Sequence, residues 1–133
     1  MALVCWKDEY SVHVKVIDEQ HKWFFELINR LATVKNGDSP ALGAILDELL
    51  DYAVYHFSIE ERIWTEHGCP QFEEHKESHR KFIHKVVLVG NDLKEGKDIQ
   101  PNQVMEWAGS WLLRHILKRD QQLIPYVGEK KSQ

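Results

Sequence analysis

The sequence predicts an all-α fold, an antiparallel up-down four-helix bundle with an ordered N-terminal arm. Four segments carry apolar residues at the three- and four-residue spacing of an amphipathic helix. Pro and Gly interrupt the chain between these segments, and none of the segments alternates between apolar and polar residues as a half-buried strand does. The length of 133 residues suits one compact domain with a core several helices deep. We therefore expect a single domain over residues 1–133, with short turns between antiparallel helices.

The arm is expected at residues 1–17, before the first helical stripe. Trp6 and Tyr10 supply aromatic surface there, and Val12, Val14 and Val16 alternate along the chain. An arm of this composition is expected to pack across the bundle. The bundle follows at about residues 18–120, and residues 121–133 form a C-terminal tail.

Three breaks separate the helices, at residues 36–40, 67–70 and 90–101. Each contains a glycine that can take the left-handed conformation that ends a helix, namely Gly37, Gly68 and Gly90. Each ends with a proline suited to the first turn of the next helix, namely Pro40, Pro70 and Pro101. Ser39 is the expected N-cap of the second helix.

Each helix places histidine on its apolar stripe. The four stripes are His21, Phe24, Phe25, Ile28 and Leu31; then Leu42, Ile45, Leu49, Tyr52, His56, Ile59 and Ile63; then Phe72, His75, His79, Phe82, Ile83 and Val86; and finally Val104, Ala108, Trp111, Leu112, His115 and Ile116. Five of the eight histidines are therefore expected to face the core. His13, His67 and His84 lie off these stripes and are not expected to bind a ligand.

Charge and composition argue against several classes of function. The net charge is -4, and Lys and Arg form no cluster before the C-terminal tail, so a nucleic-acid partner is not expected. No stretch approaches the roughly 20 apolar residues of a membrane span, and the apolar N-terminus is too short for a signal peptide. We expect no membrane span and a cytoplasmic location. Cys5 and Cys69 are too few and too far apart for a zinc ribbon or a disulfide scaffold, and we interpret them as reduced structural thiols.

The buried histidines indicate a metal site. Polar groups buried without partners would each cost several kcal/mol, which a domain stable by only about 5–15 kcal/mol cannot tolerate. His56 and Glu60 are four residues apart, as are His75 and His79, so each pair lies on one helix face and can reach one metal or two adjacent metals. A bound metal would remove the cost of burial.

His21 and His115 add single ligands on the first and fourth helices, and Asp120 is the last candidate. Asp120 follows His115 by five residues, which in an ideal helix leaves it about 140° away from the direction of the histidine. Either the helix is distorted at its end, or Asp120 approaches the site from a different side.

Together these residues resemble the ligand signature of the hemerythrin family. The set is His21, His56-x-x-x-Glu60, His75-x-x-x-His79 and His115-x-x-x-x-Asp120. Flanking residues resemble the bacterial members in particular, namely Trp6, Ile17, Asp18, Gln20, Trp111 and Leu112. The resemblance runs from about residue 6 to residue 126, and it is specific because seven positions on four helices have to match. Where the family commonly has an aromatic residue, this chain has Cys69.

The resemblance implies two non-haem iron ions with an oxo or hydroxo bridge. One iron would be bound by His75, His79 and His115, the other by His21 and His56, with Glu60 and Asp120 bridging the two. The first iron then has six ligands and the second has five, which leaves one octahedral position open for dioxygen. Structural zinc sites, in contrast, are closed and tetrahedral.

The implied function is reversible binding of dioxygen for transport, storage or delivery, and not catalysis. The nonpolar residues expected to wall the open position are Phe24, Phe57, Trp111, Leu112 and Ile116. An oxygen-accepting protein is a candidate partner. One alternative is a diiron oxidase or ferroxidase, but those sites use paired Glu-x-x-His motifs, which the chain lacks. The other is an oxygen or redox sensor, which normally carries a signalling domain for which 133 residues leave no room.

Overall fold

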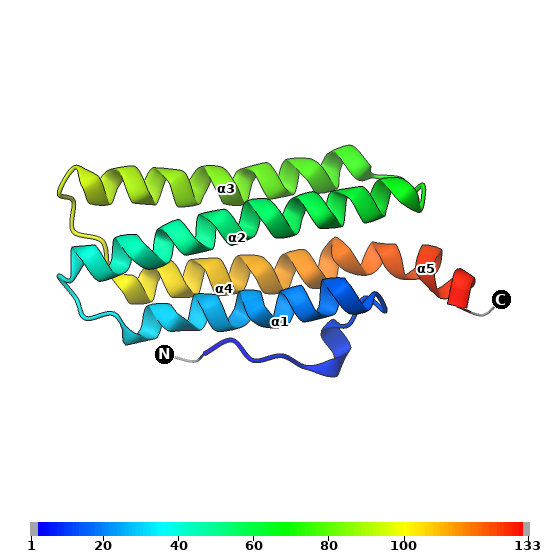
Figure 1. Ribbon diagram of the computed structural model, residues 1–133, viewed down its shortest axis with the longest axis horizontal. Coiled ribbons are helices and arrows are strands. Elements are labelled where there is room, and N and C mark those ends of the chain that lie inside the picture. The colour runs from blue at the N-terminus through cyan, green and yellow to red at the C-terminus, as the bar shows by residue number, and fades with distance from the viewer. Residues whose placement is uncertain (1–2, 132–133) are drawn as a thin grey trace.

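The protein is described here by a computed structural model that covers residues 3–131. Its long helices are α1 (Lys15–Asn29), α2 (Ser39–Glu66), α3 (Phe72–Lys94) and α4 (Pro101–Lys118). They lie side by side, each antiparallel to the one before it (Figure 1). The predicted all-α four-helix bundle is therefore confirmed. Within residues 3–131 there is no strand, and none of the helices is both long and apolar enough to cross a membrane.

The turn between α1 and α2 differs from the prediction in its cap. A short 3-10 helix, η2 (Arg30–Thr33), continues α1. Asp38 is the N-cap of α2 in place of Ser39, because its side chain accepts a hydrogen bond from the backbone N–H of Ala41 at 3.1 Å. Ser39 is the first residue of the helix, and Pro40 lies in the first turn as expected. A carboxylate at this position also interacts favourably with the positive end of the helix dipole.

At most of the helix ends, glycine and proline have the roles predicted from the sequence. Gly37 and Gly68 have φ values of +89° and +62°, the left-handed conformation expected of them. Pro101 is the first residue of α4. Pro70, however, lies in the turn before α3 and not in its first turn.

The prediction that Gly90 ends α3 is wrong. The helix continues to Lys94, and Gly96 adopts the left-handed conformation instead, with φ of +85°. A glycine inside a helix costs only about 1 kcal/mol relative to alanine. Val86 and Leu93, on either side of Gly90, both pack against the core, and that burial outweighs the cost.

The N-terminal arm is ordered from Leu3 onward, and the first two residues assigned to it lie outside the described residues. It contains a short 3-10 helix, η1 (Asp8–Tyr10), and it is tied to the end of α1 by the Asn29 side chain. Asn29 accepts a hydrogen bond from the backbone N–H of Val4 at 2.8 Å and donates one to the Val4 carbonyl at 2.6 Å. Gly109 on α4 leaves room for Val4, since a Cβ there would meet the valine at 2.5 Å. Because α1 begins at Lys15, the last three residues assigned to the arm belong to the helix.

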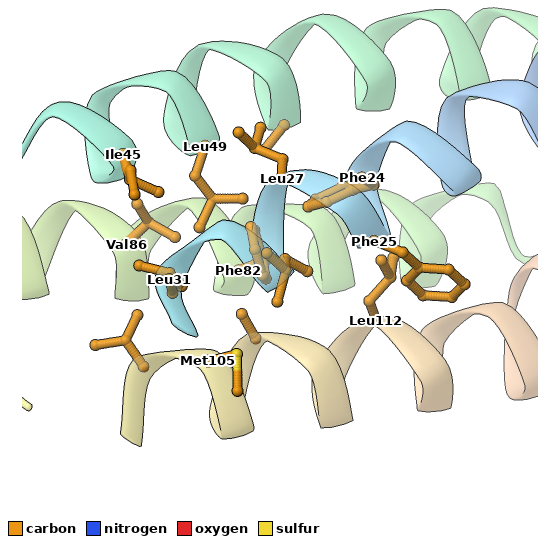
Figure 2. Packing of buried hydrophobic residues seen from close by; sticks show 14 of the residues in the cluster. Phe24, Phe25, Leu27, Leu31, Ile45, Leu49, Phe82, Val86, Met105 and Leu112 are labelled. Atoms are coloured by element: carbon orange, nitrogen blue, oxygen red, sulfur yellow. The ribbon is translucent and has the colours of Figure 1, made fainter. Parts of the chain in front are cut away.

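Two clusters of buried apolar residues hold the bundle together. The larger joins the four long helices and includes Leu31, Leu49, Val86 and Met105 (Figure 2). The smaller consists of Val12, Ile17, Trp64, Cys69, Leu123 and Val127. Its last two members come from η3 (Asp120–Leu123) and α5 (Ile124–Lys131), which follow α4.

A layer of polar residues separates the two clusters. On α1, His21 lies between Ile17 of the smaller cluster and Phe24 of the larger one. On α2, Glu60 lies in the same way between Trp64 and Phe57. The bundle therefore surrounds its polar residues with apolar ones on both sides.

Candidate metal centre

Seven polar side chains form this layer, and each residue is at most 3% exposed. They are His21, His56, Glu60, His75, His79, His115 and Asp120. These are the seven ligands expected from the sequence, and the structure brings all of them together. Their geometry, described next, shows whether they could hold metal ions.

The end of α4 explains how Asp120 reaches the centre. The helix ends at Lys118, and Arg119 adopts φ of -106° and ψ of -57° before the 3-10 turn of η3 begins. The backbone N–H of Arg119 still donates to the carbonyl of His115 at 2.8 Å. The tighter turn brings Asp120 Oδ1 to 3.0 Å from His115 Nε2. Of the two alternatives left by the sequence, the distorted helix end is the one observed.

Glu60 divides its two oxygens between two groups of histidines. Its Oε1 lies 2.7 Å from His75 Nε2, 3.0 Å from His79 Nε2 and 3.5 Å from His115 Nε2. Its Oε2 lies 3.2 Å from Nε2 of both His21 and His56. The carboxylate thus faces three imidazoles with one oxygen and two with the other.

Asp120 makes the same division. Its Oδ1 lies 3.0 Å from His115 Nε2 and 3.5 Å from His75 Nε2. Its Oδ2 lies 3.1 Å from His21 Nε2. Both carboxylates therefore stand between a group of three histidines and a group of two.

The other ring nitrogen is held from outside the centre in three of the histidines. The Nδ1 pairs are His56 with Gln20 Oε1 at 2.7 Å, His79 with Glu61 Oε2 at 2.9 Å and His115 with Ser78 Oγ at 3.0 Å. Because an amide oxygen and a carboxylate can only accept, His56 and His79 carry their proton on Nδ1. Their Nε2 lone pairs then point at the carboxylates.

The residues that hold these rings were not predicted from the sequence. Gln20 offered a signal, because it is a polar residue three positions after Ile17 and four before Phe24, both of which face the core. Glu61 and Ser78 directly follow or precede a ligand, and spacing alone does not show that they turn back toward one.

The charges of the buried groups are strongly coupled. Burial alone would lower the pKa of His21, but Asp120 and Glu60 outweigh it and raise the pKa to about 9. The pKa of His115 is raised in the same way, mainly by Asp120, whereas burial lowers that of His56. Burial would raise the pKa of Glu60, yet the surrounding histidines hold it well below the ordinary range. Ionised carboxylates thus face imidazoles throughout the centre.

The donor set fits metal ions. His56 Nε2 and both side-chain oxygens of Asp120 make no hydrogen bond, although each lies 3.0–3.2 Å from a polar atom of the centre. These converging lone pairs are buried without hydrogen-bond donors, and burial of such polar groups is costly. Bound cations would remove that cost by accepting the lone pairs. Two ligands at about 2.1 Å on neighbouring corners of an octahedron lie about 3.0 Å apart, close to the separations observed. Two overlapping groups could hold a metal, one with His21 and His56 and the other with the remaining three histidines, and both include Glu60.

Aromatic rings cover each histidine of the three-histidine group. Phe57 stacks on His79 with ring centroids 3.9 Å apart, and Trp111 stacks on His115 at 4.6 Å. Both aromatic residues were expected beside the ligands. Trp64, which was not predicted to lie beside the site, stacks on His75 with ring centroids 4.0 Å apart.

The other expected wall residues lie in the larger apolar cluster. The Phe24 ring is edge-on to His56, with centroids 5.7 Å apart. Leu112 and Ile116 are fully buried in the same cluster. Their position relative to an open coordination site stays a prediction.

The remaining histidines lie outside the centre, as expected. His13 and His84 are exposed. His67 follows the end of α2, where its Nδ1 lies 2.9 Å from the carbonyl oxygen of Ile63. Its ring therefore adds a second hydrogen bond to a carbonyl at the helix end that already accepts the backbone N–H of His67 at 3.1 Å.

Comparison with known proteins agrees with this geometry. Residues 12–127 match the sequence model of the Hemerythrin HHE cation binding domain. The chain is 34% identical to a bacteriohemerythrin of Stenotrophomonas maltophilia, covering 91% of this chain and 79% of that protein. It is 30% identical to a bacteriohemerythrin of Pseudomonas aeruginosa, covering 100% and 87% respectively. A crystal structure of wild-type hemerythrin superimposes with a TM-score of 0.87 at 29% identity, covering 95% of this chain and 98% of the other.

Proposed function

This chain belongs to the hemerythrin family, and from that premise we propose that it binds dioxygen reversibly at a non-haem diiron centre. In this proposal one iron would be held by His75, His79 and His115 and the other by His21 and His56. Glu60 and Asp120 would serve both irons, together with an oxo or hydroxo group. The biological role would be oxygen transport, storage or delivery.

The division of the carboxylate oxygens is the observation that carries the proposal. Glu60 and Asp120 each turn one oxygen to the group that contains His115 and the other to the group that contains His21. A carboxylate that served a single metal would not need to face two groups of imidazoles. Two carboxylates that do so from different helices provide the pair of bridges that a dinuclear centre requires.

The side chains of the protein would orient the ligands and exclude water. Gln20 and Glu61 hold the Nδ1 protons of His56 and His79, which leaves each Nε2 free to bind metal. When two ferrous ions are bound, they can together supply the two electrons that reversible binding of dioxygen requires. The histidine group with only two members leaves fewer protein donors on its side, and this favours an open position there.

The apolar clusters on both sides favour binding over catalysis. The proposed wall of the open position comprises Phe24, Phe57, Trp111, Leu112 and Ile116, which bring no acid or base to that side. A proton donor is what a diiron oxidase would need in order to release reduced oxygen products. We therefore propose a carrier and not an enzyme. An oxygen-accepting partner and a cytoplasmic location stay predictions from the sequence.

A visible spectrum recorded during oxygen cycling tests this function. Anaerobically reduced, iron-loaded protein should gain colour in air and lose it under vacuum over repeated cycles, with two irons per chain by metal analysis. Colour that forms once and is not reversed by vacuum, with oxygen consumed at each addition of reductant, would indicate an oxidase. Protein that takes up one zinc and no iron when both metals are supplied would contradict the diiron centre.

A further inference from the structure

We propose that Glu61 is a positioning residue that makes the three-histidine side of the centre the more electron-rich side. The inference rests on the proposed diiron function and adds to it a residue outside the ligand set. Glu61 would do so through His79, whose Nδ1–H it accepts at 2.9 Å.

The partners that hold the histidine rings differ in charge. Gln20 offers His56 a neutral amide oxygen, and Ser78 offers His115 a hydroxyl. His21 and His75 have no hydrogen-bond partner at Nδ1. Within residues 3–127, Glu61 is therefore the one ionisable group that holds a ligand from outside.

Glu61 occupies this position because of the helix geometry of α2. Neighbouring residues of a helix point about 100° apart, so Glu60 enters the centre while Glu61 reaches toward α3, where His79 lies. The two helices are adjacent in the bundle (Figure 1). The Glu61 side chain is 22% exposed, and among the described residues no Lys or Arg nitrogen lies within 4.0 Å of it. Its negative charge is thus directed at the imidazole and not at a neighbouring cation.

A carboxylate that accepts the N–H of a metal-bound imidazole increases the basicity of that ligand, and such partners typically contribute 10–100-fold to metal affinity or activity. More electron density on Nε2 of His79 stabilises ferric over ferrous iron. Removing the charge of Glu61 should therefore raise the reduction potential of the centre. The neutral partner of His56 leaves the two-histidine side without this effect, and placing a carboxylate there should lower the potential.

The structure suggests that Glu61→Gln will still fold and load iron. The Gln amide oxygen can accept the same hydrogen bond, and Phe57 stacks on the His79 ring nearly in parallel, at an interplanar angle of 6°. The ring should therefore keep its orientation when only the charge is removed. Glu61→Ala, in contrast, removes both the charge and the hydrogen bond.

The experiment compares wild type with Glu61→Gln, Glu61→Ala and Gln20→Glu, with Glu66→Gln on the exposed part of α2 as the control. Iron per chain is counted, the rate of iron loss to a chelator is measured, and the reduction potential is determined by titration with redox mediators. Glu61→Gln should keep two irons and shift the one-electron equilibrium between ferric and ferrous iron by tenfold or more, which raises the reduction potential by at least about 59 mV. Gln20→Glu should lower the potential, Glu61→Ala should lose iron faster than Glu61→Gln, and Glu66→Gln should match wild type.

The outcomes separate this inference from the function on which it rests. If wild type binds two irons and cycles oxygen but Glu61→Gln has an unchanged potential, the charge of Glu61 has no effect and only the inference is overturned. If Glu61→Gln does not fold, Gln20→Glu serves as the test instead. An unchanged reduction potential in Gln20→Glu would then overturn the inference. If wild type itself holds no iron pair, both proposals are overturned.

Discussion

Replacing Glu60 with Gln tests the proposed centre directly. Gln has nearly the same shape, so the packing between the apolar clusters should persist, but one of its terminal atoms becomes an NH2 group without a lone pair for metal. The two oxygens of Glu60 lie 2.7–3.5 Å from the Nε2 atoms of all five buried histidines. The substitution therefore removes an oxygen from one side of the centre in either orientation of the amide.

The size of the effect follows from what a ligand contributes. Residues that only support a ligand are worth 10–100-fold in metal affinity, so the loss of a direct ligand should cost at least about 100-fold, or about 2.7 kcal/mol. With iron in excess, the stabilisation of the folded chain by metal falls by the same amount. For a domain of this size, 1 kcal/mol corresponds to about 4 °C, so the difference in melting temperature between iron-loaded and iron-free protein should shrink by about 10 °C.

The assay combines iron counting with thermal melting. Each protein is loaded with ferrous iron without oxygen, desalted, analysed for iron, and melted before and after treatment with a chelator. Wild type should retain two irons per chain and melt higher with iron than without it, whereas Glu60→Gln should retain at most one. Glu77→Gln is the control, since that side chain is 54% exposed and, within the part of the chain that the structure describes, forms an ion pair with Arg80 alone. Two irons per chain and an undiminished melting difference in Glu60→Gln would refute its role as a bridge.

Three further substitutions test other parts of the structure. Leu112→Ala should still load two irons but lose its reversible colour faster in air, because water enters the enlarged pocket. Leu46→Ala is the control, since Leu46 is also buried but lies away from the centre, and its colour should last as long as that of wild type. Equal rates of colour loss in wild type and Leu112→Ala would show that Leu112 does not keep water from the centre. Changing both Cys5 and Cys69 to Ala should leave the iron count unchanged, since neither belongs to the groups that could hold a metal, and a loss of iron would contradict this. Asn29→Ala removes two hydrogen bonds to the arm and should lower the free energy of unfolding by about 1–3 kcal/mol, measured by urea titration, with faster proteolysis of residues 3–14. An arm cleaved at the wild-type rate would mean that Asn29 does not hold it.

The sequence alone determined the helices and the spacing of the candidate ligands. The apolar stripes predicted the bundle, and the pairs His56 with Glu60 and His75 with His79 followed from the helical repeat. Both are local properties, because positions within one helix are related by a fixed rotation and rise. Helix ends were less predictable: Gly90 lies inside α3, since burial on both sides of it outweighs the small helical cost of glycine.

Only the tertiary structure decided how the ligands meet. The reach of Asp120 depends on a 3-10 turn after α4, and an ideal helix would have directed its side chain elsewhere. The division of the Glu60 oxygens, and the hydrogen bond from His79 to Glu61, depend on how α2 is placed against the other helices. These features join residues that are distant in sequence, and packing between the helices selects the rotamers that bring them within hydrogen-bond distance. The helical repeat shows which face a side chain occupies, but the atom it presents and its partner are set by the neighbouring helices.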